Sequence, residues 1–245
     1  MDDQTNLLKE KLSQACRILY YERATTQGRG HQCYILEGER MLIPGHLHPL
    51  GLSLGDMQPE DIVTIDFDGN VLEGKHSEPM GEFYIYPAIF RKRKDVKSII
   101  HIHPPNLGIL VSSGQNILPV TRDSLLFRAG LPIFEKFPLY IGSKELAEQA
   151  AEKLGDANAL IHKGHGAVVV GRSIENALLT ALTLERAARI QLEASQTGNL
   201  SMLSEEEVSK HHSTHTQRSD EALEEEFNTY VIRLKKWEQG KILPM

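Results

Sequence analysis

Cysteine is scarce in this chain, which contains only Cys16 and Cys33. Two cysteines cannot build a disulfide framework, and their spacing is not that of a metal site. The sequence therefore excludes a small disulfide-stapled scaffold. It favours a protein of a reducing, cytoplasmic compartment.

Long apolar runs and targeting signals are also missing. No apolar stretch approaches the ~18 residues that a membrane-spanning helix needs, and residues 1–6 are acidic and polar, unlike a secretory or transit signal. The net charge is -6 and the pI is near 6.0, which argues against a nucleic-acid partner. The basic run at residues 91–94 is short and typical of a solvated helix end. We therefore expect neither a membrane nor a nucleic acid as a partner.

The rest of the composition is that of an ordinary globular protein. Hydrophobic residues make up 40% of the chain and charged residues 24%. The length of 245 residues fits one domain, 1–245, with a sizeable core. The sequence becomes polar after Gly198. We expect residues 199–245 to be a C-terminal extension that packs on the domain or on a neighbouring subunit.

Hydrophobic periodicity predicts helices that alternate with short strands and hairpins. Ser143 and Ser173 are expected helix N-caps, and Gly155 is an expected helix end. The pattern indicates an α/β fold of three α/β/α layers, with a mixed or antiparallel central sheet flanked by helices. Helices are expected over residues 6–25, 81–92, 106–113, 143–154, 174–195 and 221–237, and strands over 33–36, 41–43, 62–67, 71–72, 98–103, 131–134, 139–141, 159–162 and 167–170.

Two histidines stand two positions apart in one of these strands. Side chains at i and i+2 of a strand point to the same face. His101 and His103 should therefore project together, with Ile100 and Ile102 on the opposite face. Solvated histidines are the alternative, but the isoleucines indicate a buried strand, and buried imidazoles need a metal or a carboxylate. The pair is thus expected to supply two ligands of a metal site.

His165 and Glu82 are the best candidates for the remaining ligands. His165 lies between two glycines at a turn between strands, where its imidazole is unobstructed. The alternative is a turn histidine bonded to the backbone. Glu82 precedes the His101 strand, at the expected start of a helix. Spacing alone favours a helix-start role for Glu82, and Glu78 competes with it as a ligand.

Three stretches of sequence together resemble the class II aldolase/adducin family, over about residues 12–194. The family includes L-fuculose-phosphate aldolase and L-ribulose-5-phosphate 4-epimerase. The resemblance implies one divalent metal per chain on His101, His103 and His165, with Glu82 as a ligand or acid/base. Zinc is favoured, and manganese, iron or cobalt are alternatives. It also implies a class II aldolase-like fold and a homotetramer with active sites at subunit interfaces. The stretches are Gly81-Glu82 through His101-Ile102-His103-Pro104, residues 165–171, and Glu175-Asn176-Ala177 into residues 184–188.

The chain departs from the sugar-phosphate members at three phosphate-holding elements. Met80-Gly81 replace a Ser-Ser pair, and neither side chain donates a hydrogen bond. Residues 30–33 replace a Gly-Asn-x-Ser element, and Pro44-Gly45-His46 replace a Pro-Ser-Gly turn. Tyr86 also stands where a helix histidine is usual. The altered phosphate elements argue against a phosphorylated substrate. The Gly30-His31 pair and residues 184–191 resemble the family's decarboxylase-like branch.

We therefore predict a metal-dependent carbon–carbon lyase, a decarboxylase of a small hydroxylated aromatic or hydroxy-keto acid acting through a metal-stabilised enolate. Glu82 or Tyr86 would transfer the proton. Arg29 and His31 are candidates for binding the substrate carboxylate, although Arg29 also fits a solvated loop. Alternatives are an aldolase or epimerase of a sugar or sugar phosphate, an adducin-like interaction module, and iron-based oxygen chemistry.

Five further histidines have loop-like, polar surroundings and are expected to be solvated rather than to form a second metal site. The C-terminal segment is long enough for one of them to reach a neighbouring subunit's active site. They are His46, His48, His211, His212 and His215.

Overall fold

The computed structural model contains one eight-stranded sheet in the order β4-β3-β2-β1-β5-β8-β7-β6. It describes residues 3–46, 51–128, 130–136, 140–215 and 218–243, without the side chains of 211–215. Only β6 and β7 pair in parallel, and every other neighbouring pair is antiparallel. The strands are β1 (Gly30–Leu36), β2 (Arg40–Pro44), β3 (Ile62–Asp66), β4 (Val71–Glu73), β5 (Ser98–Ile102), β6 (Ile133–Phe134), β7 (Ala159–His162) and β8 (Gly166–Gly171).

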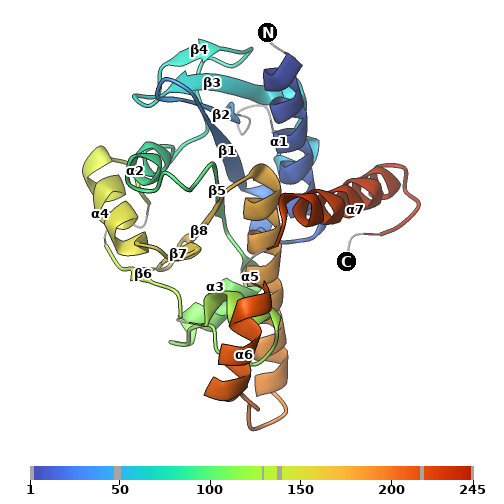
Figure 1. The fold of residues 1–245 in the computed structure, drawn as a ribbon. Coiled ribbons are helices and arrows are strands. Elements are labelled where there is room, and N and C mark those ends of the chain that lie inside the picture. Colours follow the sequence, from blue (N-terminus) through green and yellow to red (C-terminus); the bar gives the residue numbers. More distant parts are fainter. Residues whose placement is uncertain (1–2, 47–50, 129, 137–139, 216–217, 244–245) are drawn as a thin grey trace.

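Helices cover both faces of the sheet, so the predicted three-layer α/β architecture is confirmed. In Figure 1, α2 and α4 lie on one side of the strands, and α1, α5 and α7 lie on the other. Alternation along β5 divides the core, because Ile100 and Ile102 pack with α5 while Ile99 packs with α2. The helices are α1 (Asp3–Tyr21), α2 (Ile85–Lys92), α3 (Pro105–Ser112), α4 (Lys144–Leu154), α5 (Ile174–Ser195), α6 (Glu205–His215) and α7 (Asp220–Glu238).

The predicted hairpins and caps are confirmed. Strands β1 and β2 pair through Tyr34 and Leu42, as expected for the first hairpin. Ser143 Oγ accepts a hydrogen bond from the N–H of Leu146 and begins α4. Ser173 Oγ caps α5 in the same way. These local signals were readable because each cap or turn satisfies its own backbone groups.

The helix predicted over 81–92 begins later, at Ile85. Glu82 has φ +63°, which a right-handed helix cannot accommodate, so residues 81–84 form a turn. Pro87 then falls in the first helical turn, where a missing N–H costs little. The turn leaves Glu82 outside the helix and free to approach the end of β5.

Two other predictions of secondary structure were wrong. No strand forms at Tyr140 and Ile141 (Leu139 lies outside the described residues), because the N–H of Ile141 donates to Glu82 instead of to a sheet. The strand expected over 131–134 is reduced to Ile133–Phe134.

The polar segment before α7 is helical rather than loop-like. Helix α6 spans Glu205–His215 and thus includes the backbone of His211, His212 and His215. Ser204 and Glu207 form a reciprocal cap at its start, which explains how so polar a segment begins a helix. His46 lies on the described surface, with Nδ1 3.7 Å from a carboxylate oxygen of Glu78, whereas His48 lies outside the described residues.

The last helix, α7, packs against α1 and α5. The indole of Trp237 stacks on Tyr21 with ring centroids 5.4 Å apart, and Phe227 is 1% exposed. Arg17 and Glu238 form an ion pair of 2.7 Å between α1 and α7. Among the described helices, none is long and apolar enough to cross a membrane.

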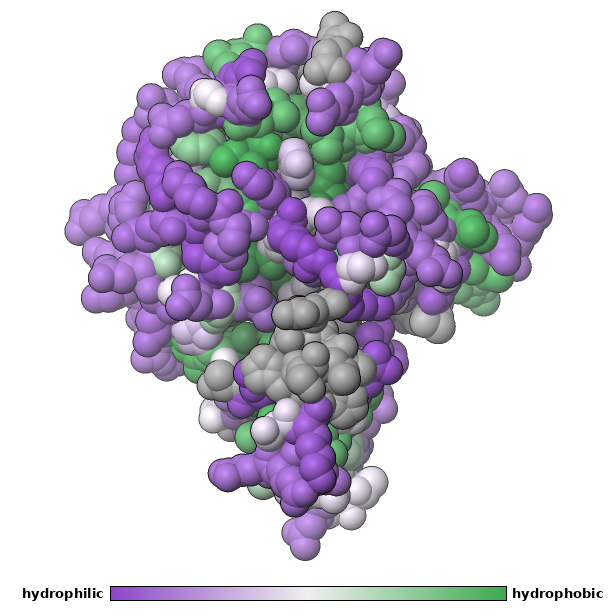
Figure 2. All heavy atoms as spheres, viewed as in Figure 1, coloured by the Kyte–Doolittle hydropathy of each residue, from purple (hydrophilic) through white to green (hydrophobic). Residues whose placement is uncertain are grey.

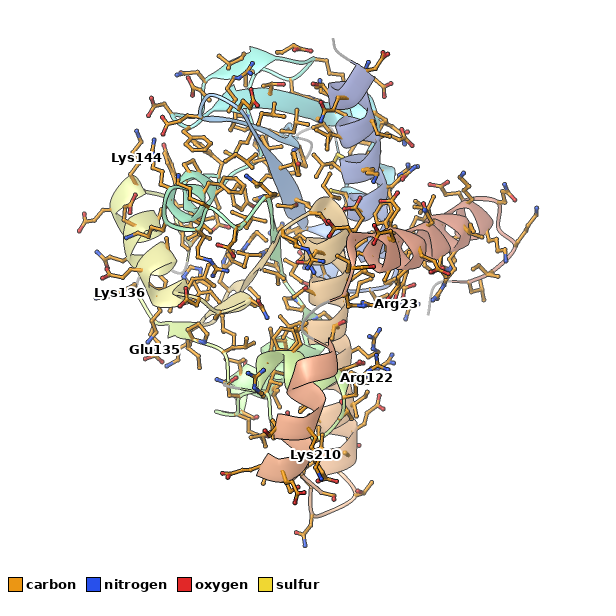
Figure 3. The ribbon with its side chains drawn as sticks, in the orientation of Figure 1. Arg23, Arg122, Glu135, Lys136, Lys144 and Lys210 are labelled. Carbon is orange, nitrogen blue, oxygen red and sulfur yellow. The ribbon has the colours of Figure 1, made fainter. Side chains whose placement is uncertain are left out.

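Charged side chains lie mainly at the periphery. Figure 2 shows that hydrophilic residues cover most of the face in view, while hydrophobic residues show mainly in its upper part. The labelled Lys136 and Lys144 point outward from the α4 side of the molecule (Figure 3), and Lys144 pairs with Asp68 at 2.6 Å. In the basic run of residues 91–94, Arg91 pairs with Glu39 and Arg93 with Asp95, so carboxylates partly neutralise it.

Candidate metal centre

Strand β5 presents His101 on the α2 side of the sheet, and His103 follows directly after the strand ends. The backbone of His103 is held at both of its polar groups. Its N–H donates to Thr25 Oγ1 over 3.1 Å, and its carbonyl accepts from the N–H of Thr26 over 2.9 Å. Both imidazoles therefore start from a backbone that hydrogen bonds hold in place.

His165 approaches from the turn between β7 and β8. A Cβ at Gly166 would collide with the carbonyl oxygen of Ile102 and with the ring of His103. Glycine at this position lets β8 approach β5 closely enough for His165 to reach the other two imidazoles. The flanking glycine was expected to free the backbone; the structure shows that it also removes a clash.

Glu82 reaches the same point from the turn before α2. One carboxylate oxygen, Oε1, accepts a hydrogen bond from the N–H of Ile141 over 2.8 Å. The other, Oε2, lies 2.9 Å from His165 Nε2 and 3.4 Å from His101 Nε2. The left-handed backbone of Glu82 is a conformation that costs about 1 kcal/mol or more for a residue other than glycine.

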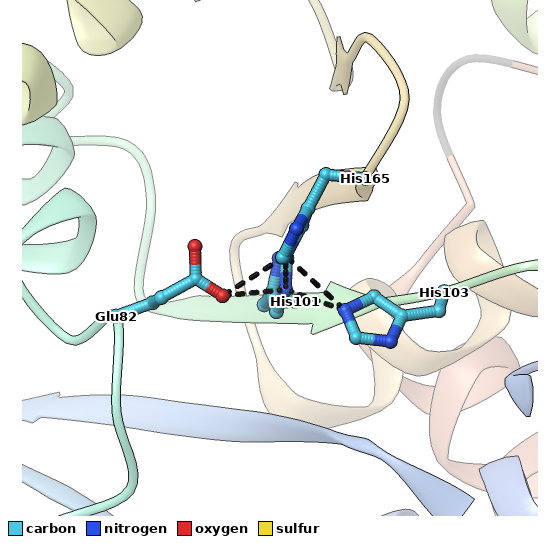
Figure 4. Close-up of side chains that lie close together, drawn as sticks. All are labelled: Glu82, His101, His103 and His165. Atoms are coloured by element: carbon cyan, nitrogen blue, oxygen red, sulfur yellow. Dashed lines mark hydrogen bonds and ion pairs between the residues drawn. The ribbon is translucent and has the colours of Figure 1, made fainter. Parts of the chain in front are cut away.

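The four side chains converge on one small volume (Figure 4). The Nε2 atom of His101 lies 3.1 Å from those of His103 and His165, which are themselves 3.3 Å apart. Nitrogen and oxygen ligands about 2.0–2.1 Å from a tetrahedral ion lie roughly 3.3 Å from one another. The spacing and the donor set both fit a divalent cation. No other group of this kind occurs among the described residues.

The protonation states also suit a metal site. Burial alone would raise the pKa of Glu82, but its hydrogen bonds with His101, His165 and the N–H of Ile141 hold that pKa well below its usual range. Burial, reinforced by the neighbouring imidazoles, lowers the pKa of His103 to about 4. A metal ligand must be deprotonated, and both groups are so at neutral pH.

His31 and Tyr86 lie behind the cluster rather than in it. His31 faces His101 across β1 and β5, with ring centroids 5.4 Å apart, and is 3% exposed. The Tyr86 hydroxyl is hydrogen-bonded to His31 Nδ1, and the backbone of Gly81 is a second partner of that ring. This network joins β1 to the turn that carries Glu82. The predicted proton transfer by Tyr86 and substrate binding by His31 stay predictions.

Replacing Tyr86 with phenylalanine should destabilise the protein by about 1–3 kcal/mol, because a buried nitrogen of His31 loses its partner. We expect metal affinity to fall by about tenfold, as for other residues that orient a ligand from outside the donor set. Urea unfolding and competition with a chelator measure the two effects. Unchanged stability and affinity would contradict the role given to this pair.

Arg29 lies at the exposed side of the cluster. Its carbonyl accepts a hydrogen bond from Thr25, the residue that also holds the His103 backbone. The Arg29 guanidinium forms no ion pair with a carboxylate among the described residues, and its charge contributes to lowering the pKa of His103. It is therefore close enough to influence the site, and its role in binding a substrate carboxylate stays a prediction.

His162 is a neighbour of the cluster that the sequence pattern did not single out. It is the last residue of β7, is 2% exposed, and has no hydrogen-bond partner at either ring nitrogen among the described residues. Its ring centroid lies 5.1 Å from that of His165. The sequence did contain a signal, because His162, like His101, follows apolar residues in an expected strand. A buried imidazole at such a position needs a partner.

The metal-free protein should lose stability as the pH falls. Burial is the main cause that lowers the pKa of both His103 and His162 to about 4, against about 6.5 in an unfolded chain. Between these values the unfolded chain binds more protons, so each histidine lowers the free energy of unfolding by up to about 1.4 kcal/mol per pH unit. Urea unfolding of chelator-treated protein between pH 7 and 4.5 measures this. If the free energy of unfolding of H162L depends on pH as steeply as that of the wild type, the prediction for His162 is wrong.

Comparison with known proteins agrees with this site. The Class II Aldolase and Adducin N-terminal domain model matches residues 10–192. The chain is 31% identical to L-fuculose phosphate aldolase of Methanocaldococcus jannaschii over 184 residues, 75% of this chain and 95% of that protein. It is 28% identical to 3,4-dihydroxyphthalate decarboxylase of Arthrobacter keyseri over 200 residues, 78% of this chain and 79% of that protein.

A solved structure shares the fold over nearly the whole chain. The crystal structure of an aldolase II superfamily protein from Pseudomonas syringae superposes with a TM-score of 0.84 at 22% identity, over 97% of this chain and 95% of the other. The match of the family model over most of the length, including all four metal-site residues, identifies the relationship. This chain belongs to the class II aldolase/adducin family.

Proposed function

We propose that this protein is a decarboxylase of a small hydroxylated acid, either aromatic or hydroxy-keto. The broader assignment follows from the family and the four-residue site: the chain is a metal-dependent lyase. One observation carries the narrower proposal. The elements that hold phosphate in the sugar-phosphate members offer few free hydrogen-bond donors here.

These elements meet near the turn that carries Glu82. The N–H of Gly45 donates to the carbonyl of Asp61, that of His46 to Glu78, and that of Met80 to Pro44. In the third element, His31 stands at the Asn position and is buried, with its ring hydrogen-bonded to the Tyr86 hydroxyl and to the backbone of Gly81. Donors already used within the chain cannot also hold a phosphate. This arrangement favours a substrate without one.

The residues of the site can support loss of a carboxylate. A divalent cation bound to the four donors would act as a Lewis acid toward a substrate oxygen. In the reaction, the bond to the carboxylate carbon breaks, its electron pair stays on the substrate, and a proton takes the place of CO2. We infer that Glu82, which is ionised at neutral pH, exchanges its role as a ligand for that of a base: Oε2 takes the proton of a substrate hydroxyl and then returns it to the carbon that has lost CO2. We infer that Arg29, at the exposed side of the cluster, binds a carboxylate of the substrate.

The experiment is a substrate panel assayed with the zinc-, manganese- and iron-loaded protein. Hydroxybenzoates, dihydroxyphthalates and hydroxy-keto acids are scored for CO2 release, and sugar phosphates for aldehyde formation. CO2 from an acid, dependent on metal, supports the proposal. Aldehyde from a sugar phosphate without CO2 from any acid would replace it with the aldolase, the activity named for the M. jannaschii relative.

The assembly is a separate proposal. We infer a homotetramer with active sites at subunit interfaces, supported by the family relationship alone. Sedimentation velocity measures the mass directly, and a monomer of 27.5 kDa would contradict it.

A further inference from the structure

We propose that a second cavity, separate from the metal centre, binds a small organic molecule that carries a diphosphate. The cavity has a volume of about 590 Å³, which falls within the roughly 300–1,000 Å³ typical of ligand sites. It lies where the C-terminal extension meets the rest of the chain, and residues of the 3₁₀ helix Asp123–Phe127, of α5, of α6 and of the first part of α7 line it. None of the four metal-site residues does so.

The wall of this cavity is positively charged, although the protein has a net charge of -6. Five arginines line the cavity, and three carboxylates pair with arginines there, those of Asp123, Asp220 and Glu226. Two guanidinium charges are therefore unbalanced among the described residues of the wall. Like charges around one cavity repel one another, and a bound anion removes that repulsion. The five are Arg122, Arg128, Arg172, Arg186 and Arg218.

Arg122 and Arg128 carry the unbalanced charges. Both are exposed, and neither forms an ion pair with a carboxylate in the part of the chain that the structure describes. Arg122, labelled in Figure 3, directly precedes the 3₁₀ helix, and Arg128 directly follows it. Ser124 holds this element in place, because its hydroxyl accepts from the N–H of Thr121 and donates to the carbonyl of Thr121. Each free guanidinium can hold a phosphate through two parallel hydrogen bonds.

Charge matching favours a diphosphate over other small anions. A carboxylate brings one negative charge and a single phosphate ester about 1.5 to 2 at neutral pH. A diphosphate brings at least two charges on adjacent groups, so one molecule can neutralise both free guanidinium groups. The arginines that already pair with carboxylates, such as Arg186 at 2.5 Å from Asp123, are less available to it.

The rest of the wall suits the uncharged part of an organic molecule. Leu125, Leu179 and Leu223 provide apolar surface beside the arginines. Thr180 is 5% exposed, and its hydroxyl has no hydrogen-bond partner among the described residues. A polar group in this situation is available to a ligand. The combination of cations, apolar side chains and a free hydroxyl favours an organic diphosphate over inorganic pyrophosphate.

The test is calorimetric titration of the full-length, zinc-loaded protein with three probes. They are ADP, adenosine, which lacks the phosphates, and pyrophosphate, which lacks the ring. We expect ADP to bind, pyrophosphate to bind more weakly and adenosine not to bind. R122Q/R128Q should weaken ADP binding about 100-fold, because each lost charge-assisted hydrogen bond costs about tenfold. R40Q/K136Q is the matched control, since it removes two positive charges from exposed positions outside the cavity, and it should bind ADP as the wild type does.

ADP could also bind the zinc directly, and H103A separates the two sites. This variant is expected to lack the metal and should bind ADP as the wild type does. Binding that is lost in H103A and kept in R122Q/R128Q would place ADP at the metal and overturn the proposal. Failure of the wild type to bind ADP, adenosine binding as tight as that of ADP, or equal weakening in R40Q/K136Q would also overturn it. If R122Q/R128Q does not fold, the single variants decide, each with a loss of about tenfold. These outcomes do not depend on whether the protein releases CO2.

Discussion

Replacing His103 with alanine should remove the bound metal and lower kcat/KM by at least about 1000-fold. Lewis-acid stabilisation is worth several kcal/mol of the barrier, and each 1.36 kcal/mol is a factor of ten in rate. The fold should survive, because the His103 backbone is held by Thr25 and Thr26 and not by its side chain.

Elemental analysis and circular dichroism test this together. We expect about one metal per chain in the wild type, almost none in H103A, and the same far-ultraviolet spectrum for both. H162L is the matched control, because it removes a neighbouring buried histidine that lies outside the donor set. Full metal content in H103A would show that the convergence of the three imidazoles is not a metal site.

Glu82 should be as important as His103 but for a different reason. Replacing it with glutamine removes a negative charge from the donor set and the group placed to carry a proton, so kcat should fall by about 10²–10⁴-fold. The amide can still accept the hydrogen bond from Ile141, which keeps the loop in place. We expect E82Q to retain metal with weakened affinity, unlike H103A.

Two variants with shorter side chains at position 82 separate the cost of the left-handed backbone from the effect of losing the carboxylate. Glu82→Gly and Glu82→Ala both lack the carboxylate and should be equally inactive. Because φ is +63° at this residue, glycine should be the more stable of the two by about 1 kcal/mol. Urea unfolding of the metal-free variants measures the difference, and a more stable alanine variant would show that the backbone relaxes out of the left-handed region.

Part of the metal centre was readable from residue spacing. The period of two along a strand placed His101 and His103 on one face, and the structure confirms that their Nε2 atoms lie 3.1 Å apart. The two glycines beside His165 marked that residue as unobstructed. Local backbone geometry decides both features, and local geometry is what a sequence pattern encodes.

The positions of Glu82 and His162 were not predictable from such patterns. Spacing favoured a helix-start role for Glu82, and only the family resemblance implied that Glu82 is a ligand of the metal. Its actual position depends on a left-handed turn and on the N–H of Ile141, 59 positions away in the chain. His162 carried no motif, and its place beside the metal centre comes from the ring of His165, whose centroid lies 5.1 Å away.

The sequence by itself determined the composition class, the alternation of helices and strands, the helix caps and the three histidines, because each depends on neighbours a few positions away. Tertiary structure alone decided that β1, β5 and β8 lie side by side, and so brought His31, His101 and His165 together. It also decided that the N–H groups of Gly45 and Met80 are already used. Pairing between distant strands depends on how the whole core closes, and no short stretch of residues carries that information.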